Sequence, residues 1–235
     1  MYNYTAQLPN LNIHEYIPRT VQMNQLRQLD EITVDLAPLA RADELGRVYL
    51  YAPEEYPSQI AASIWLSAVI NLPRISKNLG DTRLLRDTEQ DFVTSCLLRK
   101  KSDLSLLDCT KLLNHSIASH GYQFTLNKIT KWDNVLLGLM EGYTVMIGGS
   151  VYSSFESAKT SGVVPMPQPG EDLLGGQIIN LVSFNRSKDL ALAIGNRGIC
   201  EGKRGQFQYR GSYLRNLEIC RDFFILFPRI ANAND

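Results

Sequence analysis

The stretch GVVPMPQPGEDLLGGQ, residues 162–177, runs directly into the apolar segment IINLVSF, residues 178–184. Three prolines at alternate positions keep the first half extended, because proline fixes the backbone angle φ. Acidic residues and a Gly-Gly pair follow, and Gln177 is the last polar residue before a run that predicts a buried strand. The stretch therefore raises the question of what a glutamine does where a polar loop enters the core.

Around this stretch, the sequence divides into a helical first part and a strand-rich second part. Residues 58–73 predict a helix that is apolar on almost every side and therefore buried, with Ser58 as its N-cap and Pro73 as its stop signal. Further helices are predicted at 81–101, 103–121 and 128–142. Patterns of period two predict strands at 143–152, 177–184, 190–196, 205–214 and 221–227, with an earlier strand at 47–51. Helices followed by strands indicate an α+β fold, with two lobes as its simplest form.

The charge composition argues against several classes of partner. The 235 residues carry 24 Lys+Arg and 24 Asp+Glu, so the formal net charge is zero. Nucleic-acid and membrane-surface binding both depend on excess positive charge, so neither partner is expected. The one basic run, Arg99–Lys101, is interpreted as a helix end or solvated loop rather than a phosphate site. No stretch reaches the ~20 apolar residues of a membrane helix, and no secretory signal is recognisable at the N-terminus, so secretion through a signal peptide is not expected.

Cysteine and histidine are too scattered to indicate a metal site. None of the four cysteines belongs to a Cys-x-x-Cys pair, and the chain has three histidines. A zinc site needs several such ligands close together. We expect no metal and no cofactor, and we interpret the cysteines as reduced, mostly buried thiols.

An ordered series of motifs runs through the strand-rich half. Val-Tyr-x-x-Phe at 151–155 comes first, followed by the Gly- and Pro-containing loop from Gly162 and by an acidic residue before Gly-Gly. Gly-x-Phe at 205–207 and Asp-Phe-Phe at 222–224 come last. In this order the motifs resemble the second lobe of the papain-like cysteine peptidases, most closely the branch found in bacteria and large DNA viruses. The resemblance covers residues 45–230 and is firmest from 128 onward.

The chemistry of that family needs a thiolate at a helix N-terminus, a histidine from the other lobe and an asparagine that orients the histidine. The resemblance implies that Gln177 stands at the histidine position and Asn196 at the asparagine position. The best register implies Gln59 at the nucleophile position, next to Ser58. The separations from Gln59 are 118 to Gln177 and 137 to Asn196, close to the ~130–150 residues typical of the family.

Two further family positions also depart from the pattern. The family position of the glutamine that helps to form the oxyanion hole falls near Pro53, so this glutamine is missing. The tryptophan that covers the asparagine in the family is also missing from Asn-Arg-Gly-Ile at 196–199. A glutamine amide cannot shuttle a proton, so Ser58 would have no base to activate it. The resemblance thus implies an inactive member, a pseudopeptidase without catalytic residues, in which Gln59, Gln177 and Asn196 are degenerate equivalents.

This interpretation divides the chain into an N-terminal extension, 1–45, a helical lobe, 46–127, and an antiparallel β-barrel-like lobe, 128–235, of one papain-like unit. Gly175 and Gly176 would let the backbone pass close to the other lobe. The expected function is a structural or protein-interaction module, with a groove that binds an extended segment or is filled by residues 1–45. Protein partners are expected and a small-molecule ligand is not. By analogy alone, the location is cytoplasmic or in a virion.

Several alternatives stay open. Gln177 could be only a strand-entry residue of an unrelated fold, and Asn196 could be a turn residue beside glycines. An active cysteine hydrolase could use an unusual pair such as Cys96 with His120, although a helical Cys96 lacks the turn that exposes a nucleophile. Cys200 is more simply a structural thiol than a relocated nucleophile. A third alternative is a regulator that captures peptides or inhibits true peptidases.

Overall fold

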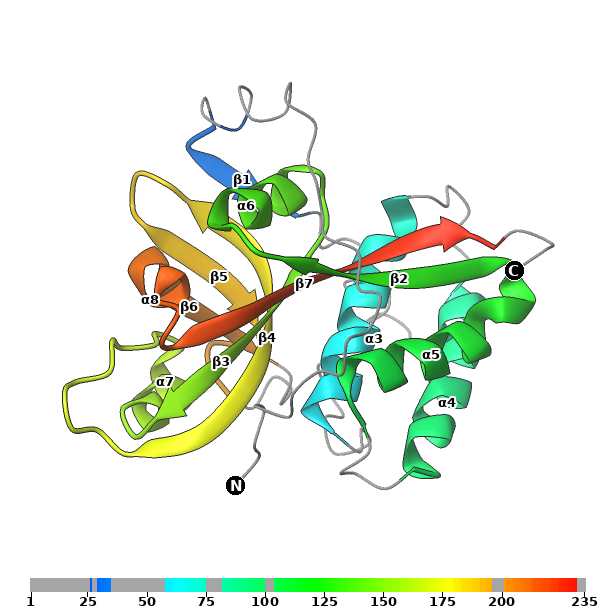
Figure 1. Cartoon of the computed structure of the whole chain (residues 1–235), viewed down its shortest axis with the longest axis horizontal. Coiled ribbons are helices and arrows are strands. Elements are labelled where there is room, and N and C mark those ends of the chain that lie inside the picture. The colour runs from blue at the N-terminus through cyan, green and yellow to red at the C-terminus, as the bar shows by residue number, and fades with distance from the viewer. Residues whose placement is uncertain are drawn as a thin grey trace.

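The computed structural model describes residues 26, 29–34, 58–74, 82–99, 104–195 and 201–231. Helices α3, α4 and α5 gather on one side of the molecule, and a curved sheet with three short helices forms the other side (Figure 1). The long ribbon of β2 and β7 runs across both sides. Within the described residues, no helix has the length and apolar run needed to cross a membrane.

Helix α3, Gln59–Asn71, lies at the centre of the molecule, as its all-round apolar sequence predicts. Every residue from Ala61 to Asn71 is buried. The Ala61 amide donates a hydrogen bond of 3.1 Å to the Ser58 hydroxyl, which confirms Ser58 as the N-cap. The α-helix gives way to a 3-10 turn, η2 (Leu72–Arg74), at the position of Pro73.

Helices α4, Thr82–Leu97, and α5, Leu106–Ile117, pack beside α3. Phe92 of α4 stacks on Trp65 of α3 with ring centroids 6.2 Å apart, so Trp65 is the core aromatic that the helical spacing indicates. Helix α5 continues into the 3-10 turn η4, Ala118–His120, and ends at Gly121, whose φ of 75° suits glycine. Both helices confirm the predicted elements, with somewhat shorter bounds.

The sheet is antiparallel throughout and has the strand order β2-β7-β3-β4-β5-β6, with β1 paired to β4. Its strands are β1 (Glu31–Thr33), β2 (Tyr122–Ile129), β3 (Val145–Tyr152), β4 (Leu173–Asn185), β5 (Leu190–Ile194), β6 (Gln206–Arg210) and β7 (Cys220–Ile230). The α+β fold and the antiparallel sheet are therefore confirmed. The sheet stays open, because β2 and β6 remain its two ends among the described strands.

Strand β4 is the element into which the Pro-rich stretch leads, and it begins with a bulge. The register places Val151 opposite Gly175 but Tyr152 opposite Leu173, so Leu174 is an extra residue on β4. Gly175 has a φ of 151°, and a Cβ atom there would meet no atom of the described residues within 4 Å. Close approach of the described chain therefore does not explain this glycine. Glycine is suited to this position because of its backbone angle beside the bulge.

Buried polar side chains connect α3 to the sheet through hydrogen bonds. The Asn180 side-chain amide donates hydrogen bonds to the Ser67 hydroxyl at 2.7 Å and to the Ser63 carbonyl at 3.2 Å. Asn71 donates to the Leu226 carbonyl of β7 at 2.8 Å and accepts from the Thr144 amide at 2.9 Å. All of these polar side chains are fully buried, so the hydrogen bonds fix the orientation of α3 on the sheet.

The observed elements differ from the predicted ones in three places. Strand β2 was not predicted, and it takes up the start of the helix predicted at 128–142, which is observed as α6, Trp132–Met140. A short helix, α7 (Phe155–Ser161), was not predicted either. The strand predicted at 205–214 ends at Arg210, because Asp189 accepts hydrogen bonds from the Gly211 and Ser212 amides and starts α8, Gly211–Arg215. The predicted strand at 47–51 lies outside the described residues.

Part of the predicted N-terminal extension belongs to the sheet. Strand β1 pairs with the end of β4, Glu31 opposite Asn185 and Thr33 opposite Ser183. Ile32 and Val34 are buried there. The described part of residues 1–45 therefore completes the core on the sheet side.

Candidate functional site

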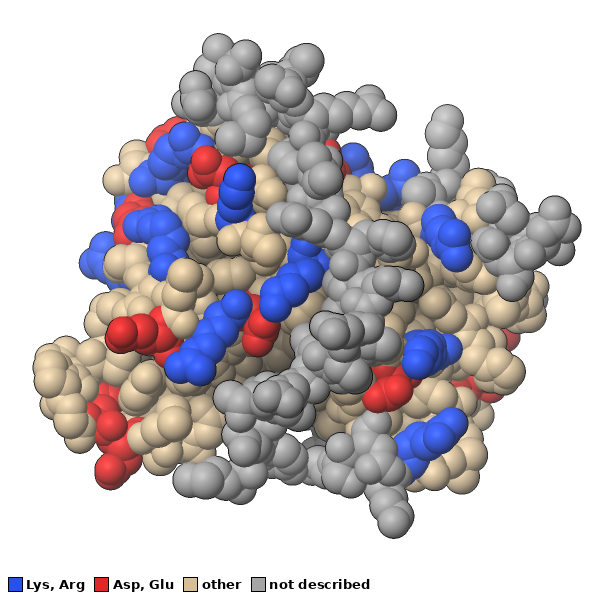
Figure 2. Space-filling view, in the orientation of Figure 1, with Lys and Arg blue, Asp and Glu red and all other residues tan. Residues whose placement is uncertain are grey.

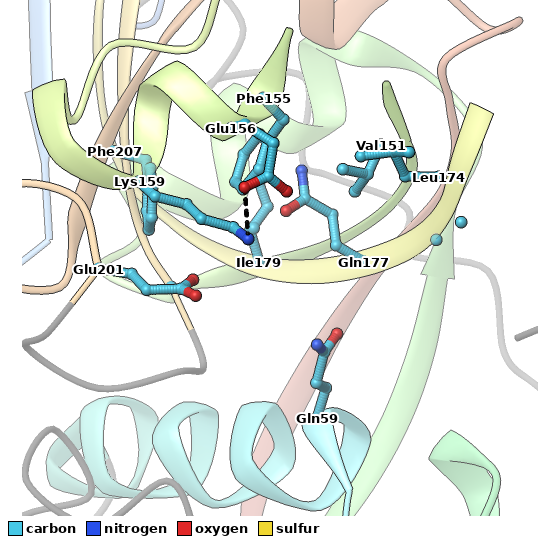
Figure 3. Close-up of a pocket in the computed structure, with 13 residues that line it drawn as sticks. Gln59, Val151, Phe155, Glu156, Lys159, Leu174, Gln177, Ile179, Glu201 and Phe207 are labelled. Carbon is cyan, nitrogen blue, oxygen red and sulfur yellow. Dashed lines mark ion pairs between the residues drawn. The ribbon is translucent and has the colours of Figure 1, made fainter. Parts of the chain in front are cut away.

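A cavity of about 340 Å³ lies where the first turn of α3 faces the start of β4 (Figure 3). Its walls come from α3, β3, α7, β4 and the chain around Gly195 and Glu201. The lining residues are Gln59, Val151, Phe155, Glu156, Lys159, Leu174, Gly175, Gly176, Gln177, Ile179, Gly195, Glu201 and Phe207. This volume lies at the lower end of the range found for ligand-binding pockets, roughly 300–1,000 Å³.

The structure brings two of the three predicted site residues to this cavity. Gln59 is the first residue of α3, and Gln177 lies in β4 opposite Gly149. Asn196 lies outside the described residues, but Gly195 immediately before it lines the cavity.

The two glutamine amides do not point at each other. Gln59 extends from α3 toward β4, whereas the Gln177 amide extends away from Gln59 (Figure 3). The strand pleat explains this, because successive side chains of a strand project from opposite faces. Asn180 bonds α3 from one face of β4, so Gln177, an odd number of residues away, projects from the other face.

On that other face, Gln177 is held by a tyrosine. Its Nε2 atom donates a hydrogen bond of 3.0 Å to the phenolic oxygen of Tyr209. Tyr209 is fully buried, and burial raises its pKa well above the usual value, an effect that the hydrogen bond from Gln177 opposes. The Tyr213 ring packs edge-on against Tyr209 with centroids 5.3 Å apart. The Gln177 side chain is therefore part of a polar contact inside the sheet half.

The apolar wall of the cavity is built around two stacked rings. Phe155 at the start of α7 and Phe207 of β6 have centroids 5.5 Å apart and planes 27° apart. Val151, Leu174 and Ile179 complete this wall. The wall gives the cavity an apolar floor beside the two amides.

Charged side chains border the cavity on the side of α7. Lys159 forms an ion pair of 2.8 Å with Glu156, three residues earlier. Glu201 extends toward the same lysine (Figure 3). The rim therefore combines one ammonium group with two carboxylates.

Other candidate residues lie elsewhere. The Ser58 hydroxyl caps α3. Cys96, Cys109 and Cys220 are buried, while His115 and His120 are exposed. Burial raises the pKa of Cys220 to about 12.

Pro53 and Cys200 lie outside the described residues. The described residues contain no group of three metal-ligating side chains.

Glu156, Lys159 and Tyr209 were not predicted as site residues. Tyr209 follows Phe207 by two residues in β6, so period-two alternation signals that both are buried. The pairing of Glu156 with Lys159 has the spacing of neighbours on a helix, but α7 itself was not predicted. These signals could have identified the residues, but not their common position.

Neither half of the molecule carries charges of one sign alone on the visible face. Lys and Arg side chains alternate with Asp and Glu over the visible face (Figure 2). Lys128 pairs with Asp222 at 3.2 Å and Arg215 with Asp189 at 2.9 Å. This mixture fits the zero net charge of the sequence.

Comparisons with known proteins support the resemblance. No protein-family model matches the sequence. Across the whole fold the chain is similar to xylellain, a cysteine protease from Xylella fastidiosa, with a TM-score of 0.66, 96% of this chain and 95% of that chain covered, and 14% identity. Over 96 residues it is 26% identical to an uncharacterized peptidase C1-like protein of Acanthamoeba polyphaga mimivirus.

The viral match takes in 40% of this chain and 31% of the viral protein, so the chain spans about a third of that relative's length. The likeness to xylellain concerns the fold, since sequence identity is low. The viral match adds a relationship in sequence to a protein named as peptidase-like. The chain therefore has the papain-like α+β fold, and over part of its length it is related in sequence to a viral protein named as peptidase C1-like.

Proposed function

We propose that this chain is a papain-like protein without peptidase activity that works as a structural or protein-interaction module. The observation that carries the proposal is the cavity shared by Gln59 and Gln177. One glutamine begins the central helix, and the other follows the Gly-Gly pair on β4. Neither amide can act as a nucleophile or as a general base. Under this proposal, Gln59, Gln177 and Asn196 are the degenerate equivalents of the catalytic residues.

The surroundings of Gln177 support the same proposal. A general base must lie within hydrogen-bond reach of the group that it deprotonates. Gln177 instead donates to Tyr209, on the face of β4 opposite α3. The side chain thus serves the packing of the sheet half.

We assign the cavity to an extended segment of a protein partner. The floor of Phe155, Phe207 and Ile179 suits an apolar side chain, while the Lys159–Glu156 pair offers charged groups for the polar atoms of a peptide. A place among the structural proteins of a virion is one setting for such a module, by analogy with the viral relative.

Labelling with an electrophilic peptide that reacts with activated thiols tests the loss of activity. We expect no stoichiometric labelling of the folded protein, whereas all four cysteines react after denaturation. Labelling of one cysteine in the folded state, lost on its replacement by alanine, would show an active cysteine hydrolase instead. Cys200, which precedes the lining residue Glu201 in the sequence, and the Cys96/His120 pair are the positions to replace first.

Restoring the family residues tests the register. The double variant Gln59→Cys/Gln177→His should stay folded, because both side chains border a cavity that leaves space. Unfolding of both single variants would contradict the assignment of these positions. Gained reactivity of the new thiol toward the peptide probe would support it further.

Two neighbouring leucines offer a matched test of binding. Leu174 lines the cavity and is 50% exposed, whereas Leu173 is 55% exposed and is not among the lining residues. In a peptide library displayed against the protein, Leu174→Trp should weaken the selected peptides roughly tenfold or more, about 1.4 kcal/mol. Leu173→Trp should leave binding unchanged. Equal effects of both variants, or selection of no peptide, would remove the cavity from the binding function.

A further inference from the structure

The Pro-rich loop between α7 and β4, residues 162–172, projects from the sheet half of the molecule (Figure 1). It presents apolar side chains to solvent, because Val163 is 53% exposed, Met166 is 36% exposed and Pro169 is exposed as well. None of these three residues is among those that line the cavity. The loop is therefore a second surface, separate from the candidate site, and the proposed function does not use it.

Proline restricts the shape of this loop over six consecutive residues. Each position from Val164 to Pro169 is either a proline or the residue before one. Proline holds φ at about −65°, and a residue that precedes proline is kept out of the helical region and in the extended region. The alternation of these two restrictions favours the polyproline II helix, which has three residues per turn and makes no internal backbone hydrogen bonds.

Three residues per turn bring Val163, Met166 and Pro169 onto one face of the loop. All three are exposed, whereas the neighbouring Val164 is buried and Pro167 is half-buried. Successive members of the exposed face are roughly 9 Å apart along the segment. The outward face is thus an apolar strip with the period of a polyproline II ligand.

Hydrogen bonds hold both ends of the loop against the sheet half. At its start, the Val164 amide donates to the Gln208 carbonyl of β6 at 2.9 Å. At its end, the Asp172 carbonyl accepts a hydrogen bond of 3.0 Å from the Ser153 amide. A loop fixed in this way loses little conformational freedom when it binds, so more of the contact energy appears as affinity.

We propose that this loop is a ligand for the aromatic-lined groove of a partner protein that recognises polyproline II segments. Such grooves pack Tyr and Trp rings against proline and other apolar side chains of the segment. The hydroxyl and indole N–H groups of the rings can donate hydrogen bonds to the carbonyls of the segment. Among the described residues, none donates a hydrogen bond to the carbonyls of Pro165 or Pro167, so no described group competes with such donors.

Charge further defines the partner. Residues 161–176 contain no Lys, Arg or His, and their two charged residues are Glu171 and Asp172. The Glu171 carboxylate accepts hydrogen bonds from the amides of Gln168 and Ser154, whereas Asp172 is exposed. A groove with Lys or Arg beside its aromatic rings therefore complements the loop better than an acidic groove does.

The test measures binding of the full chain to a panel of purified SH3, WW and EVH1 domains, the classes that read polyproline II segments. We expect saturable binding to at least one domain with basic residues beside its groove. Binding should weaken as salt is raised, because screening reduces the contribution of Asp172. Met166→Asp puts a charge at the centre of the apolar face and should weaken binding roughly tenfold or more. Pro167→Gly keeps that face but loosens the loop, so it should weaken binding by about two- to fivefold.

Ile230→Asp is the matched control. Ile230 is 65% exposed and is the last residue of β7, a strand that ends on the helical side of the molecule, away from the loop (Figure 1). This variant should bind like the wild type. Absence of binding to every domain of the panel overturns the proposal, as does undiminished binding by Met166→Asp or an equal loss in Ile230→Asp. Because Val163, Met166 and Pro169 do not line the cavity, such a result would leave the proposed function untouched.

Discussion

Gln177 and Tyr209 are joined by a hydrogen bond of 3.0 Å from the glutamine amide to the phenolic oxygen. This contact links β4 to β6 across the width of β5, which pairs with both strands. It also directs the side chain of Gln177, the last polar residue of the Pro-rich stretch, toward the interior of the sheet half. The polar residue that enters the core thereby finds a partner in a fully buried side chain.

The two side chains of this pair should be energetically coupled, so that removing both costs less than the sum of the two single losses. Gln177→Leu leaves the buried Tyr209 hydroxyl without its partner and should lower the free energy of unfolding by about 1–3 kcal/mol. Tyr209→Phe alone should cost about 1 kcal/mol. Urea unfolding of the double variant should show a loss smaller than the sum by about 1 kcal/mol. Additive losses would mean that the two side chains do not interact in solution.

Asn71 should be among the most sensitive polar positions. Asn71→Ala leaves two buried backbone groups, the Leu226 carbonyl and the Thr144 amide, without a hydrogen-bond partner. The variant should lower the free energy of unfolding by roughly 2–5 kcal/mol. Asn114 makes the same kind of double contact with the backbone of Phe124, at 2.9 and 2.6 Å, but at a partly buried edge. Asn114→Ala should therefore cost only about 1–2 kcal/mol, because water reaches the freed groups. Similar unfolding midpoints for the two variants would count against this ranking.

Stability should fall in alkaline solution, and Cys220 should contribute to the fall. Its pKa rises from an ordinary 9.0 to about 12 in the folded chain because of burial. Below pH 9 the thiol is protonated in both states and adds no pH dependence. Between pH 9 and 12 only the unfolded chain loses the proton, so the free energy of unfolding falls by up to about 1.4 kcal/mol per pH unit.

The measurement is urea unfolding of wild type and Cys220→Ala from neutral pH upward, under reducing conditions. Tyr209, Tyr213 and Cys109, whose pKa values also rise, remain in both proteins. The difference between the two curves therefore reports Cys220 together with its effect on the pKa values of Tyr209 and Tyr213, and the variant should decline less steeply above pH 9. Parallel curves would show that the thiol ionises as readily in the folded chain as in the unfolded one.

Glu171 should hold the Pro-rich loop in its observed shape. Its carboxylate accepts hydrogen bonds from the Gln168 amide at 3.0 Å and from the Ser154 amide at 3.2 Å. The bond from Gln168 lowers the pKa of Glu171 below its usual 4.5. Protection of these two amides should be present above that pH and should be lost as the pH falls through the lowered pKa.

Amide hydrogen exchange, corrected for intrinsic rates, measures this effect. Glu171→Ala should expose both amides at neutral pH, while Asp172→Ala, which removes the same charge one residue later, should leave them protected. Equal protection in the two variants would assign the loop shape to its prolines instead.

The elements that the sequence predicts best are those with local signals. The N-cap serine and the largely apolar composition of α3 suffice to place the helix and to predict its burial. Strand β2 was missed because its pairing partner, β7, lies about 100 residues further along the chain. Helix α7 has only seven residues, too few for helical periodicity to stand out.

The candidate site was predictable in position but not in orientation. The family register brought Gln59 and Gln177 to one cavity, as the structure has them. The direction of the Gln177 side chain depends on which face of β4 meets α3, and the bonds from Asn180 to Ser63 and Ser67 set this. Such a tertiary contact does not appear in the hydrophobic periodicity of the sequence.

The β2–β7 ribbon bears on how wide the cavity can open. The two strands pair over eight residues, from beside α5 to the centre of the sheet, and Asn71 ties α3 to the same ribbon. Because this ribbon runs from one half of the molecule to the other, it resists separation of the two halves. If a partner segment binds in the cavity as we propose, it must therefore fit the width that core packing sets.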